Sequence, residues 1–588
     1  MKNKITLRAI FELILQKRPA LIYGQIITLF AIIVSVPIPL MLPVMVDEVL
    51  LQKPGVFVEY IDTFFGAQSA FGYIFIVTAS VVFLRFIYYF FTVILTKIFT
   101  QISKYVTFMI RKQLLEHLKH TAMNEYETLG SGAITAKLVT DVNTLDSFIM
   151  TSVSKLVSSI LTLIAIGIVM ISIDPILGLL ILIIQPIIML LSKRMSRVVG
   201  ELKKRENHAI ADFQESVGET LELFGQIKAS NQEEYFFTKA QHKAKTIETT
   251  SNEYGYKNVA YERLSYTIFL VMFELLRASG LLLVAYSDLS IGMMFAMFGY
   301  IWFIMTPVQD LLSMQYSYAA AKAALERINE ILALKQEKSA NKPLEGEEVE
   351  IQLENVSFSY TPTEPILKNI SLQIPMRSKI ALIGSSGSGK TTLAQLIAGF
   401  YEKSSGEIFY NNIPTQELNK SSLRSRVYLV LQMPILFNDS LRFNISMGNE
   451  SISDAQILQA LEVAQLTQML QKMPEGLDTR VGHHGIRLSG GQRQRLSIAR
   501  MIIANPSVVI FDESTSALDV HTETKLQLAL EPILQDKTVI TIAHRLSTVK
   551  SVEYIYVLES GEVIQRGTHQ ELEEDEGHYK EFVKEQLL

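Results

Sequence analysis

A glycine-rich loop, residues 384–392, lies between an apolar run, 380–383, and a run with a helical pattern, 393–398. Its glycines let the backbone turn tightly and approach a ligand without a Cβ in the way. Free N–H groups at the start of a helix bind anions, and in G-x-x-x-x-G-K-[ST] the lysine contacts nucleotide phosphates while the next hydroxyl holds Mg²⁺. A chance glycine turn is the alternative. The candidate phosphate-binding residues are Gly384, Ser385, Ser386, Gly387, Ser388, Gly389, Lys390, Thr391 and Thr392.

An acidic pair, Asp512 and Glu513, ends a second apolar run, 508–511, which predicts a buried strand. Mg²⁺ is usually bound by one or two carboxylates together with phosphate oxygens, which suits Asp512. A carboxylate beside an attacking water can orient or deprotonate it, which suits Glu513. Alone, such a pair could also end a strand by chance.

Two further features are weaker when each is read alone. Small residues, from Leu488 to Gln492, precede a helical pattern over 493–503 and offer a second anion site at a helix start. Tyr360 ends an alternating run, 356–360, and could stack on a nucleotide base, since every base has a π-face. A core tyrosine is the simpler interpretation of Tyr360.

The first half of the chain is typical of a membrane protein. Charged residues make up 19% of the chain and apolar residues 49%, whereas soluble proteins carry about a quarter charged residues. Six apolar runs have about the 20 residues that a bilayer span requires. Prolines late in the first and sixth runs predict kinks. The six runs are 20–46, 71–95, 149–171, 176–192, 264–286 and 291–312.

Basic residues concentrate in the long segments after the second and fourth runs, whereas the other connections are short and acidic. The positive-inside rule therefore places the N-terminus and both long segments in the cytoplasm. The helical periodicity of these segments predicts that the spans continue as helices and turn at tips near 127–133 and 219–226; independent cytoplasmic hairpins are the alternative. Residues 5–15 predict an amphipathic helix on the membrane surface, or simply the start of the first span.

We expect three regions: a transmembrane domain, 1–334, a linker, 335–348, and an α/β domain, 349–588. The linker is rich in Lys and Glu and is predicted to be solvated. The chain contains no cysteine, which excludes disulfides, thiol catalysis and cysteine-bound metals. Its net charge of −5 argues against a nucleic-acid partner.

Together the motifs resemble the ATP-binding cassette, and with the apolar runs ahead of it the chain resembles a half-size bacterial ABC exporter of the multidrug or lipid type over essentially its whole length. The resemblance rests on the glycine loop, Gln432, the 488–492 segment, Asp512–Glu513, the 516–519 segment and His544, which follow in this order. It implies a membrane α-helical bundle of six transmembrane helices with the type I exporter fold. A cytoplasmic α/β P-loop NTPase domain would be fused to this bundle.

The resemblance also implies roles for single residues. Tyr360 would stack on adenine, Gln432 would contact Mg²⁺ or the attacking water, and His544 would act as the switch histidine at the γ-phosphate. Ser489, Gly491 and Gln492 would meet ATP bound by a second subunit, and Asp519 would link the two sites. The expected catalytic residues are Glu513, His544 and Gln432, and the expected metal-binding residues are Thr391, Gln432 and Asp512.

The two hairpin tips resemble coupling helices, and the loop 479–485 resembles the segment that contacts them. Arg480 stands where an acidic residue is usual, and His483 and His484 stand where Glu-Arg is more common. The effect of these departures on coupling is left open by the sequence.

The expected function is ATP-driven, Mg²⁺-dependent export or flipping of amphipathic drug-like or lipid-like substrates by alternating access across a bacterial inner membrane. A composite ATP site needs two cassettes, so we expect a homodimer; a heterodimer with a degenerate subunit is the alternative. A dedicated exporter of one lipid, glycolipid or peptide is a second possible function. An ATP-gated membrane protein that does not pump is a third.

Charges within the expected spans are candidates for substrate contact. Arg85, Glu274 and Arg277 lie in apolar runs, where each charge costs about 2.5–3.5 kcal/mol on insertion scales. An ion pair that fixes packing is the simpler interpretation of Glu274 and Arg277. The methionines and aromatics of 291–312 likewise suit either an adaptable pocket or packing.

Overall fold

The computed structural model describes residues 4–53, 55–361, 364–432, 434–482, 488–513, 518–543 and 545–587. Side chains at 184–194, 196, 312, 316, 520, 547 and 585–587 are outside the description. The chain divides into two compact units. The first comprises Met1–Leu115 and Ile134–Ala333, and the second comprises Glu116–Ala133 and Leu334–Leu588.

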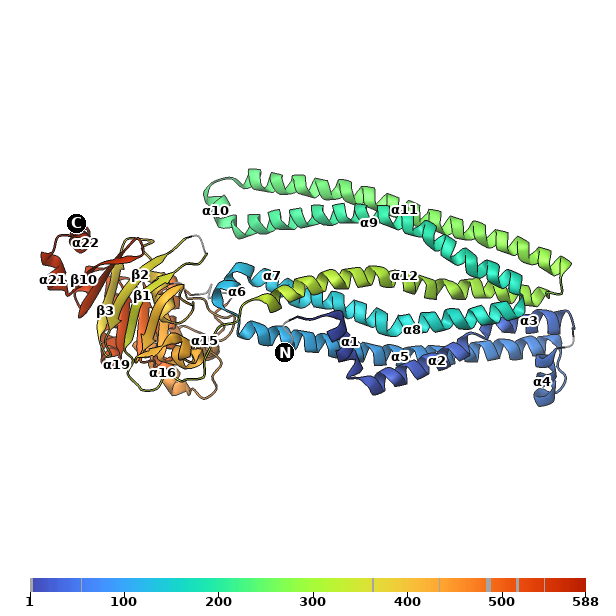
Figure 1. Ribbon diagram of the computed structural model, residues 1–588, viewed down its shortest axis with the longest axis horizontal. Coiled ribbons are helices and arrows are strands. Elements are labelled where there is room, and N and C mark those ends of the chain that lie inside the picture. The colour runs from blue at the N-terminus through green and yellow to red at the C-terminus, as the bar shows by residue number, and fades with distance from the viewer. Residues whose placement is uncertain are drawn as a thin grey trace. The chain divides into compact units, whose positions relative to one another are not determined.

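The first unit is built from long helices, several of them well beyond bilayer length (Figure 1). Helices α9, α5 and α11 run for 48, 50 and 54 residues without a break, which confirms that spans continue as helices past the roughly 20 residues a bilayer needs. The helices are α1 (Leu7–Leu15), α2 (Arg18–Ser35), η1 (Ile38–Leu40), α3 (Met41–Pro43), η2 (Val44–Leu50), α4 (Val56–Phe65), α5 (Ala70–Lys119), α7 (Ser131–Ala136), η3 (Lys137–Asp141), α8 (Val142–Ile173), α9 (Pro175–Glu222), α10 (Phe224–Ala229), α11 (Glu233–Tyr286) and α12 (Ile291–Ala333).

Five segments among the described residues are long and apolar enough to cross a membrane: Arg18–Leu50, Ala70–Lys119, Ser131–Ile173, Glu233–Tyr286 and Ile291–Ala333. The fourth expected run, 176–192, lies on α9, where part of the side chains fall outside the description. The second expected tip, 219–226, contains the end of α9 and the first turn of α10.

The prolines of the first span break its helix as predicted. Helix α2 ends at Ser35, and short 3-10, α and π segments follow before the span ends at Leu50. The hydroxyl of Tyr300 in α12 donates a hydrogen bond to the carbonyl of Val36 at 2.6 Å. Neighbouring helices can satisfy backbone groups freed by a proline in this way. Pro307, in contrast, lies inside the continuous α12.

Much of the methionine and aromatic surface of α12 is used for packing. Met294, Met297, Phe298 and Tyr300 are buried in one apolar cluster together with residues of α2, α8, α9 and α11. These four side chains therefore fit the packing interpretation rather than an open pocket.

Helix α1 lies within the predicted helical segment, 5–15, and part of its apolar surface is buried in the protein. Its apolar stripe, Ile10 and Ile14, is buried, as is the preceding Ile5. The side-chain amide of Asn329 in α12 accepts a hydrogen bond from the Ile5 N–H at 2.7 Å and donates one to the Ile5 carbonyl at 2.8 Å. The segment before α1 is therefore fixed to α12 by two hydrogen bonds to the Ile5 backbone.

The second unit contains two sheets. A four-stranded antiparallel sheet has the order β2-β1-β4-β5, and a six-stranded, mostly parallel sheet has the order β10-β9-β3-β8-β7-β6. The strands are β1 (Ile351–Phe358), β2 (Leu367–Ile374), β3 (Lys379–Gly384), β4 (Ser405–Tyr410), β5 (Ile413–Pro414), β6 (Val427–Val430), β7 (Val508–Asp512), β8 (Thr538–Ile542), β9 (Tyr554–Glu559) and β10 (Glu562–Gly567). The helices are α6 (Met123–Leu129), α13 (Lys390–Ile397), η4 (Thr415–Glu417), α14 (Lys420–Arg426), α15 (Leu441–Ser446), α16 (Asp454–Val463), α17 (Thr467–Gln471), η5 (Gly476–Asp478), α18 (Gly490–Ala504), α19 (Val520–Leu534), α20 (Leu546–Val549), α21 (His569–Glu574) and α22 (His578–Leu587).

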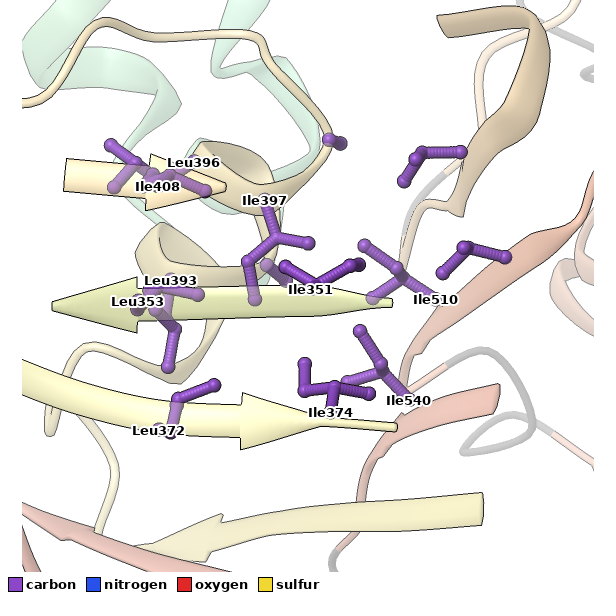
Figure 2. Packing of buried hydrophobic residues seen from close by; sticks show 14 of the residues in the cluster. Ile351, Leu353, Leu372, Ile374, Leu393, Leu396, Ile397, Ile408, Ile510 and Ile540 are labelled. Carbon is purple, nitrogen blue, oxygen red and sulfur yellow. The ribbon is translucent and has the colours of Figure 1, made fainter. Parts of the chain in front are cut away.

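Helix α13, which follows the glycine loop, is held between the two sheets. Figure 2 shows Leu393, Leu396 and Ile397 of this helix packing among side chains of both sheets, such as Ile351 and Ile510. All five side chains are buried, and each fully buried aliphatic side chain contributes roughly 1.5–3 kcal/mol. This packing fixes the helix start that the loop precedes.

The segment predicted to be a solvated linker is docked along the second unit. The Glu337 N–H donates to the carbonyl of His120 at 2.8 Å, and the N–H of Asn419 donates to the carbonyl of Lys342 at 2.7 Å. The guanidinium of Arg424 forms a bidentate pair with the Glu337 carboxylate. The charged composition of the segment is therefore used in specific contacts, which local composition alone does not reveal.

Candidate nucleotide-binding site

The glycine loop connects β3 to α13, as predicted, and its backbone requires glycine at defined positions. Gly384 has φ +147°, and a Cβ there would lie 1.9 Å from the carbonyl oxygen of Leu558. Gly389 has φ +99°, and its Cβ would lie 2.7 Å from a side-chain carbon of Leu367. Gly387 has φ +83° but faces open space. Gly384 and Gly389 are therefore required twice over, because each has a positive φ and because a Cβ there would clash with a neighbouring residue.

Lys390 is buried at the base of the loop. Its ammonium donates to the carbonyls of Gly384 at 3.0 Å and Ser385 at 2.7 Å. Burial lowers the pKa of Lys390, and the carboxylates of Glu513 and Asp512 oppose that shift. The ammonium is therefore positioned by the loop backbone where a phosphate anion would complete its partners. Ser388 and Thr392 are buried as well, whereas Ser386 is exposed.

The acidic pair ends β7 beside this loop. The hydroxyl of Thr391 donates to Oδ1 of the buried Asp512 at 3.2 Å. The side-chain amide of Gln432 donates to Oε2 of Glu513 at 2.6 Å. The structure therefore brings together the three expected metal-binding residues and the expected base through two hydrogen bonds.

Glu513 adopts a left-handed backbone conformation with φ +45°. Such a conformation costs of order 1–3 kcal/mol for a residue with a side chain, and strained residues of this kind cluster at active sites.

The donor set around Asp512 suits Mg²⁺ rather than a metal held by protein alone. Within the described residues there is no group of three or more His, Cys, Asp or Glu side chains that could hold a metal. Mg²⁺ is ordinarily bound by one or two carboxylates together with substrate phosphates and water. Asp512 and the Thr391 hydroxyl provide such a partial set.

Tyr360 follows β1 at the other side of α13. Its hydroxyl lies 3.2 Å from the hydroxyl of Thr392 and donates to the side chain of Gln395 at 3.3 Å. Its ring packs edge-on against Tyr401 at a centroid distance of 5.3 Å. The ring is partly exposed, so one face can accept a base.

The small-residue segment forms the start of α18, as predicted. Ser489 is the N-cap, its hydroxyl accepts from the Gln492 N–H at 3.2 Å, and the Gln492 side chain accepts from the Ser489 N–H at 2.8 Å. Ser489 is exposed and Gly491 is partly exposed at this helix start, which therefore remains a candidate second anion-binding surface. Asp519 caps α19 by accepting from the Thr522 N–H at 2.9 Å, and this bond lowers the pKa of Asp519.

Some predicted site residues lie outside the described residues. These are His544, residues 516 and 517, and residues 483–485, including His483 and His484. The described part of the 479–485 loop is anchored by the Leu441 N–H, which donates to the carbonyl of Thr479 at 3.0 Å.

The sequence analysis did not predict three contacts near the site. The Ser385 hydroxyl donates to Glu559 of β9 at 2.8 Å. The hydroxyl of Tyr401 lies 3.0 Å from both carboxylate oxygens of Glu127 in α6. Arg545, next to His544, pairs with the buried Glu523 of α19. No local pattern signals these contacts, because each joins residues far apart in the chain.

In the membrane unit, the predicted substrate charges lie on two helices, α11 and α5. Glu274 and Arg277 pair with each other along α11 and remain half exposed, which favours the simpler interpretation of an ion pair. Arg85 is exposed on α5. A charge pair that the sequence analysis missed, Lys155 to Asp310 at 2.7 Å, joins α8 to α12.

The fold and the site define a P-loop nucleotide-binding domain attached to a multi-pass membrane helix bundle. Residues 367–516 match the family model described as ABC transporter, and residues 21–308 match the one described as ABC transporter transmembrane region. The chain belongs to the ABC transporter family, with both its transmembrane and its ATPase domain present.

Similar proteins include named transporters. An ATP-dependent lipid A-core flippase of Photobacterium profundum is 39% identical over 304 residues, which cover 51% of this chain and 52% of the flippase. A flippase of the same name from Pectobacterium atrosepticum is 35% identical over 386 residues, 64% of this chain and 66% of that protein. ABC transporter B family member 21 of Arabidopsis thaliana is 40% identical over 275 residues, 46% of this chain and 21% of that protein. The matched part of the chain thus spans between about half and two thirds of the length of these flippases, and less of the plant protein.

A solved structure shares the fold over nearly the whole chain. It is a bacterial Atm1-family ABC exporter with ATP bound, and it matches with a TM-score of 0.82, 21% identity and coverage of 97% of this chain and 98% of that chain. The predicted fold class, a membrane helical bundle of the exporter type fused to an α/β ATPase domain, is therefore confirmed.

Proposed function

We propose that the chain is an ATP-driven exporter or flippase of amphipathic substrates that works as a homodimer. The observation that carries this proposal is the arrangement at the end of β7, where Asp512 meets Thr391 and Glu513 meets Gln432. ATP would supply the phosphoryl group, and Mg²⁺ would supply the positive charge that positions it. Lys390 and the loop N–H groups would stabilise negative charge, and Glu513 would accept a proton from water.

The second anion surface, at Ser489, supports pairing of two cassettes. Helix α18 packs with α15, α16 and β6, while the glycine loop leads into α13. By resemblance to the family, ATP bound at the loop of one copy would be contacted by Ser489 and Gly491 of a second copy. Closure of two cassettes would act on the membrane helices through the α6 tip, and the membrane unit would alternate between inward- and outward-facing states.

The relatives support a lipid-like substrate as the first choice. Two of them are lipid A-core flippases by name. A flippase dedicated to one lipid or glycolipid is therefore the second candidate, after an exporter of varied amphipathic substrates. By family and by the positive-inside pattern, we place the chain in a bacterial cell membrane with its N-terminus and ATPase domain in the cytoplasm.

Hydrolysis and transport by purified protein in vesicles test the proposal. Glu513→Gln should lower ATP hydrolysis by about 10²–10⁴-fold, the contribution of a general base, and leave binding of a fluorescent ATP analogue intact. Glu562→Gln, an exposed carboxylate on β10, is the matched control and should leave hydrolysis unchanged. Transport of a fluorescent phospholipid by Glu513→Gln at the wild-type rate would instead indicate an ATP-gated protein that does not pump.

Complementation tests the composite site. Ser489→Arg and Glu513→Gln should each abolish hydrolysis when present in every subunit. Co-reconstituted, they should recover activity, because a mixed dimer keeps one site with an intact Glu513 and an intact Ser489. Failure to recover in confirmed mixed dimers would contradict a site shared between two copies.

A further inference from the structure

Helix α4 presents an apolar stripe that the rest of the chain does not cover. Val56, Phe57, Tyr60 and Phe64 are 62%, 47%, 60% and 79% exposed. At 3.6 residues per turn these four side chains share one face of the helix. None of the ten residues of α4, all of which the structure describes, is buried. Single exposed apolar residues are ordinary, but a coherent aromatic stripe indicates a partner.

The stripe is held in a fixed orientation by contacts at both ends of α4. Near the start, Oε2 of Glu48 in η2 accepts a hydrogen bond from the Val58 N–H at 2.8 Å. Near the end, the Asp62 carboxylate accepts a hydrogen bond from the hydroxyl of Tyr73 in α5, and the Gly66 N–H closes the helix on the Asp62 carbonyl at 2.9 Å. The helix is therefore tied to the ends of two neighbouring membrane helices.

The exposed stripe is continuous with the apolar surface of a spanning helix. Helix α5 follows α4 directly, and its apolar window is only 6% buried. Phe71 and Phe75, in the first two turns of α5, are both largely exposed. Figure 1 shows α4 running across the direction of α5 at the Ala70 end of that helix. If α5 crosses the bilayer along its length, a helix in this position would lie along the membrane plane where α5 enters it.

The chemistry of α4 fits a lipid interface. Tyrosine and other aromatics are favoured at the level of the lipid head groups, and interfacial helices bury an apolar face while keeping a polar face in water. Glu59 precedes Tyr60 and is therefore turned by about 100° around the helix from it. We propose that α4 is a membrane-surface helix that inserts this stripe into the head-group and acyl boundary, between the end of the first span and the start of the second.

The contact of α4 with lipid would be linked to the start of the sixth span, α12, through two neighbouring carboxylates of η2. Glu48 holds α4, while the adjacent Asp47 is buried and accepts hydrogen bonds from the Ser290 hydroxyl and from the Gly292 N–H at 3.0 Å. The start of α12 and the lipid-bound α4 are thus fastened to successive residues of η2. The proposal goes beyond ATP-driven transport and does not depend on it.

The absence of cysteine allows a direct test in the full-length chain. Phe64→Cys, Tyr60→Cys and Glu59→Cys each introduce a sole thiol on α4, which is labelled with a nitroxide before reconstitution into phosphatidylcholine vesicles. Labels at 60 and 64 should collide several-fold more with oxygen, relative to a water-soluble nickel chelate, than the label at 59. Equal and water-like collision ratios at all three positions would overturn the proposal.

A second measurement distinguishes lipid from a second copy of the chain. A bimane label on Phe64→Cys should be quenched by phosphatidylcholine brominated near the head group more strongly than by one brominated near the chain end. Absence of quenching, or dipolar broadening between nitroxides that shows stripes facing each other, would mean that a partner chain covers α4 and would overturn the proposal.

Discussion

The phenol of Tyr401 lies 3.0 Å from both carboxylate oxygens of Glu127, which joins the ATPase sheets to the α6 tip within one compact unit. Burial and this bond raise the pKa of Tyr401, so the hydroxyl stays protonated and donates. The same ring packs edge-on against Tyr360, the candidate adenine contact. One tyrosine therefore touches both the nucleotide site and the hairpin that connects it to the membrane helices.

Tyr401→Phe removes the hydroxyl and keeps the ring. A hydrogen bond to a charged group contributes about 1.5–3 kcal/mol, so we expect basal hydrolysis to persist while lipid stimulation of hydrolysis falls several-fold. Stimulated and basal ATPase rates in vesicles measure this. Tyr410→Phe is the control, because its hydroxyl bonds only inward, to the Ile397 carbonyl at 2.5 Å, and should affect stability without changing stimulation. Equal loss of stimulation in both variants would contradict a role of the Tyr401–Glu127 hydrogen bond in coupling ATP hydrolysis to the membrane helices.

Two glycine substitutions in the loop should differ sharply. Gly384→Ala forces a Cβ against a backbone oxygen, so we expect loss of fluorescent-nucleotide binding and a lower unfolding temperature. The Cβ of Gly387→Ala would face open space, so this substitution costs only the strain of the left-handed backbone, about 1–2 kcal/mol. Binding titrations and thermal unfolding compare them; a milder effect at 384 than at 387 would show that the loop geometry is wrong.

The parts of the fold and site that the sequence predicts correctly are local. The strand, glycine loop and α13, the strand that ends in Asp512, and the capped start of α18 each follow from residue types within a few positions. Proline positions likewise anticipate the break after Ser35. Local propensity and turn chemistry suffice in these cases.

The contacts that sequence analysis misses are long-range. Tyr401 and Glu127 are 274 positions apart, and Lys155 and Asp310 are 155 apart. Neither pair leaves a periodic signal in a single chain. The segment 335–348 is mostly exposed, as its Lys and Glu residues predict, but its partners on α14 and α6 become visible only once the chain is folded.

Lys420 gives a pH-dependent prediction. It is buried at the start of α14, and burial lowers its pKa despite the nearby carboxylates of Glu337 and Glu402. The unfolded chain therefore binds more protons than the folded chain between the lowered and the ordinary pKa, so stability rises with pH across that window. Lys420→Met should slow hydrogen exchange in 335–344 at neutral pH, with a smaller effect near pH 10.

Lys420→Met removes a buried group whose charged form is disfavoured by its burial, so we expect this variant to be at least as stable as the wild type at neutral pH. Lys472→Met, at an exposed position, is the control for Lys420→Met and should leave exchange in this segment unchanged. A stabilisation that grows with pH would contradict the assignment.

The Lys155–Asp310 pair should matter more than the Glu274–Arg277 pair, because it joins two helices. Lys155→Met should alter lipid-stimulated hydrolysis, and Lys155→Asp combined with Asp310→Lys should restore part of it; polar pairs between membrane helices couple by roughly 0.6 kcal/mol on average. Arg277→Met, which breaks a pair within one helix, should change little. Lipid-stimulated ATPase rates of the variants measure this difference. Identical effects of Lys155→Met and Arg277→Met would contradict a larger role for the pair that joins two helices.

The membership of Glu116–Ala133 in the same compact unit as Leu334–Leu588 has a consequence for biogenesis. Glu127 leaves the ribosome 274 residues before Tyr401, which at about 5–20 residues per second leaves the tip without its docking surface for roughly 15–55 s. The long helices α8, α9, α11 and α12 are made in that interval. The hairpin with the α6 tip is thus an early product that a domain made later must find, and a chaperone has its longest opportunity to bind there.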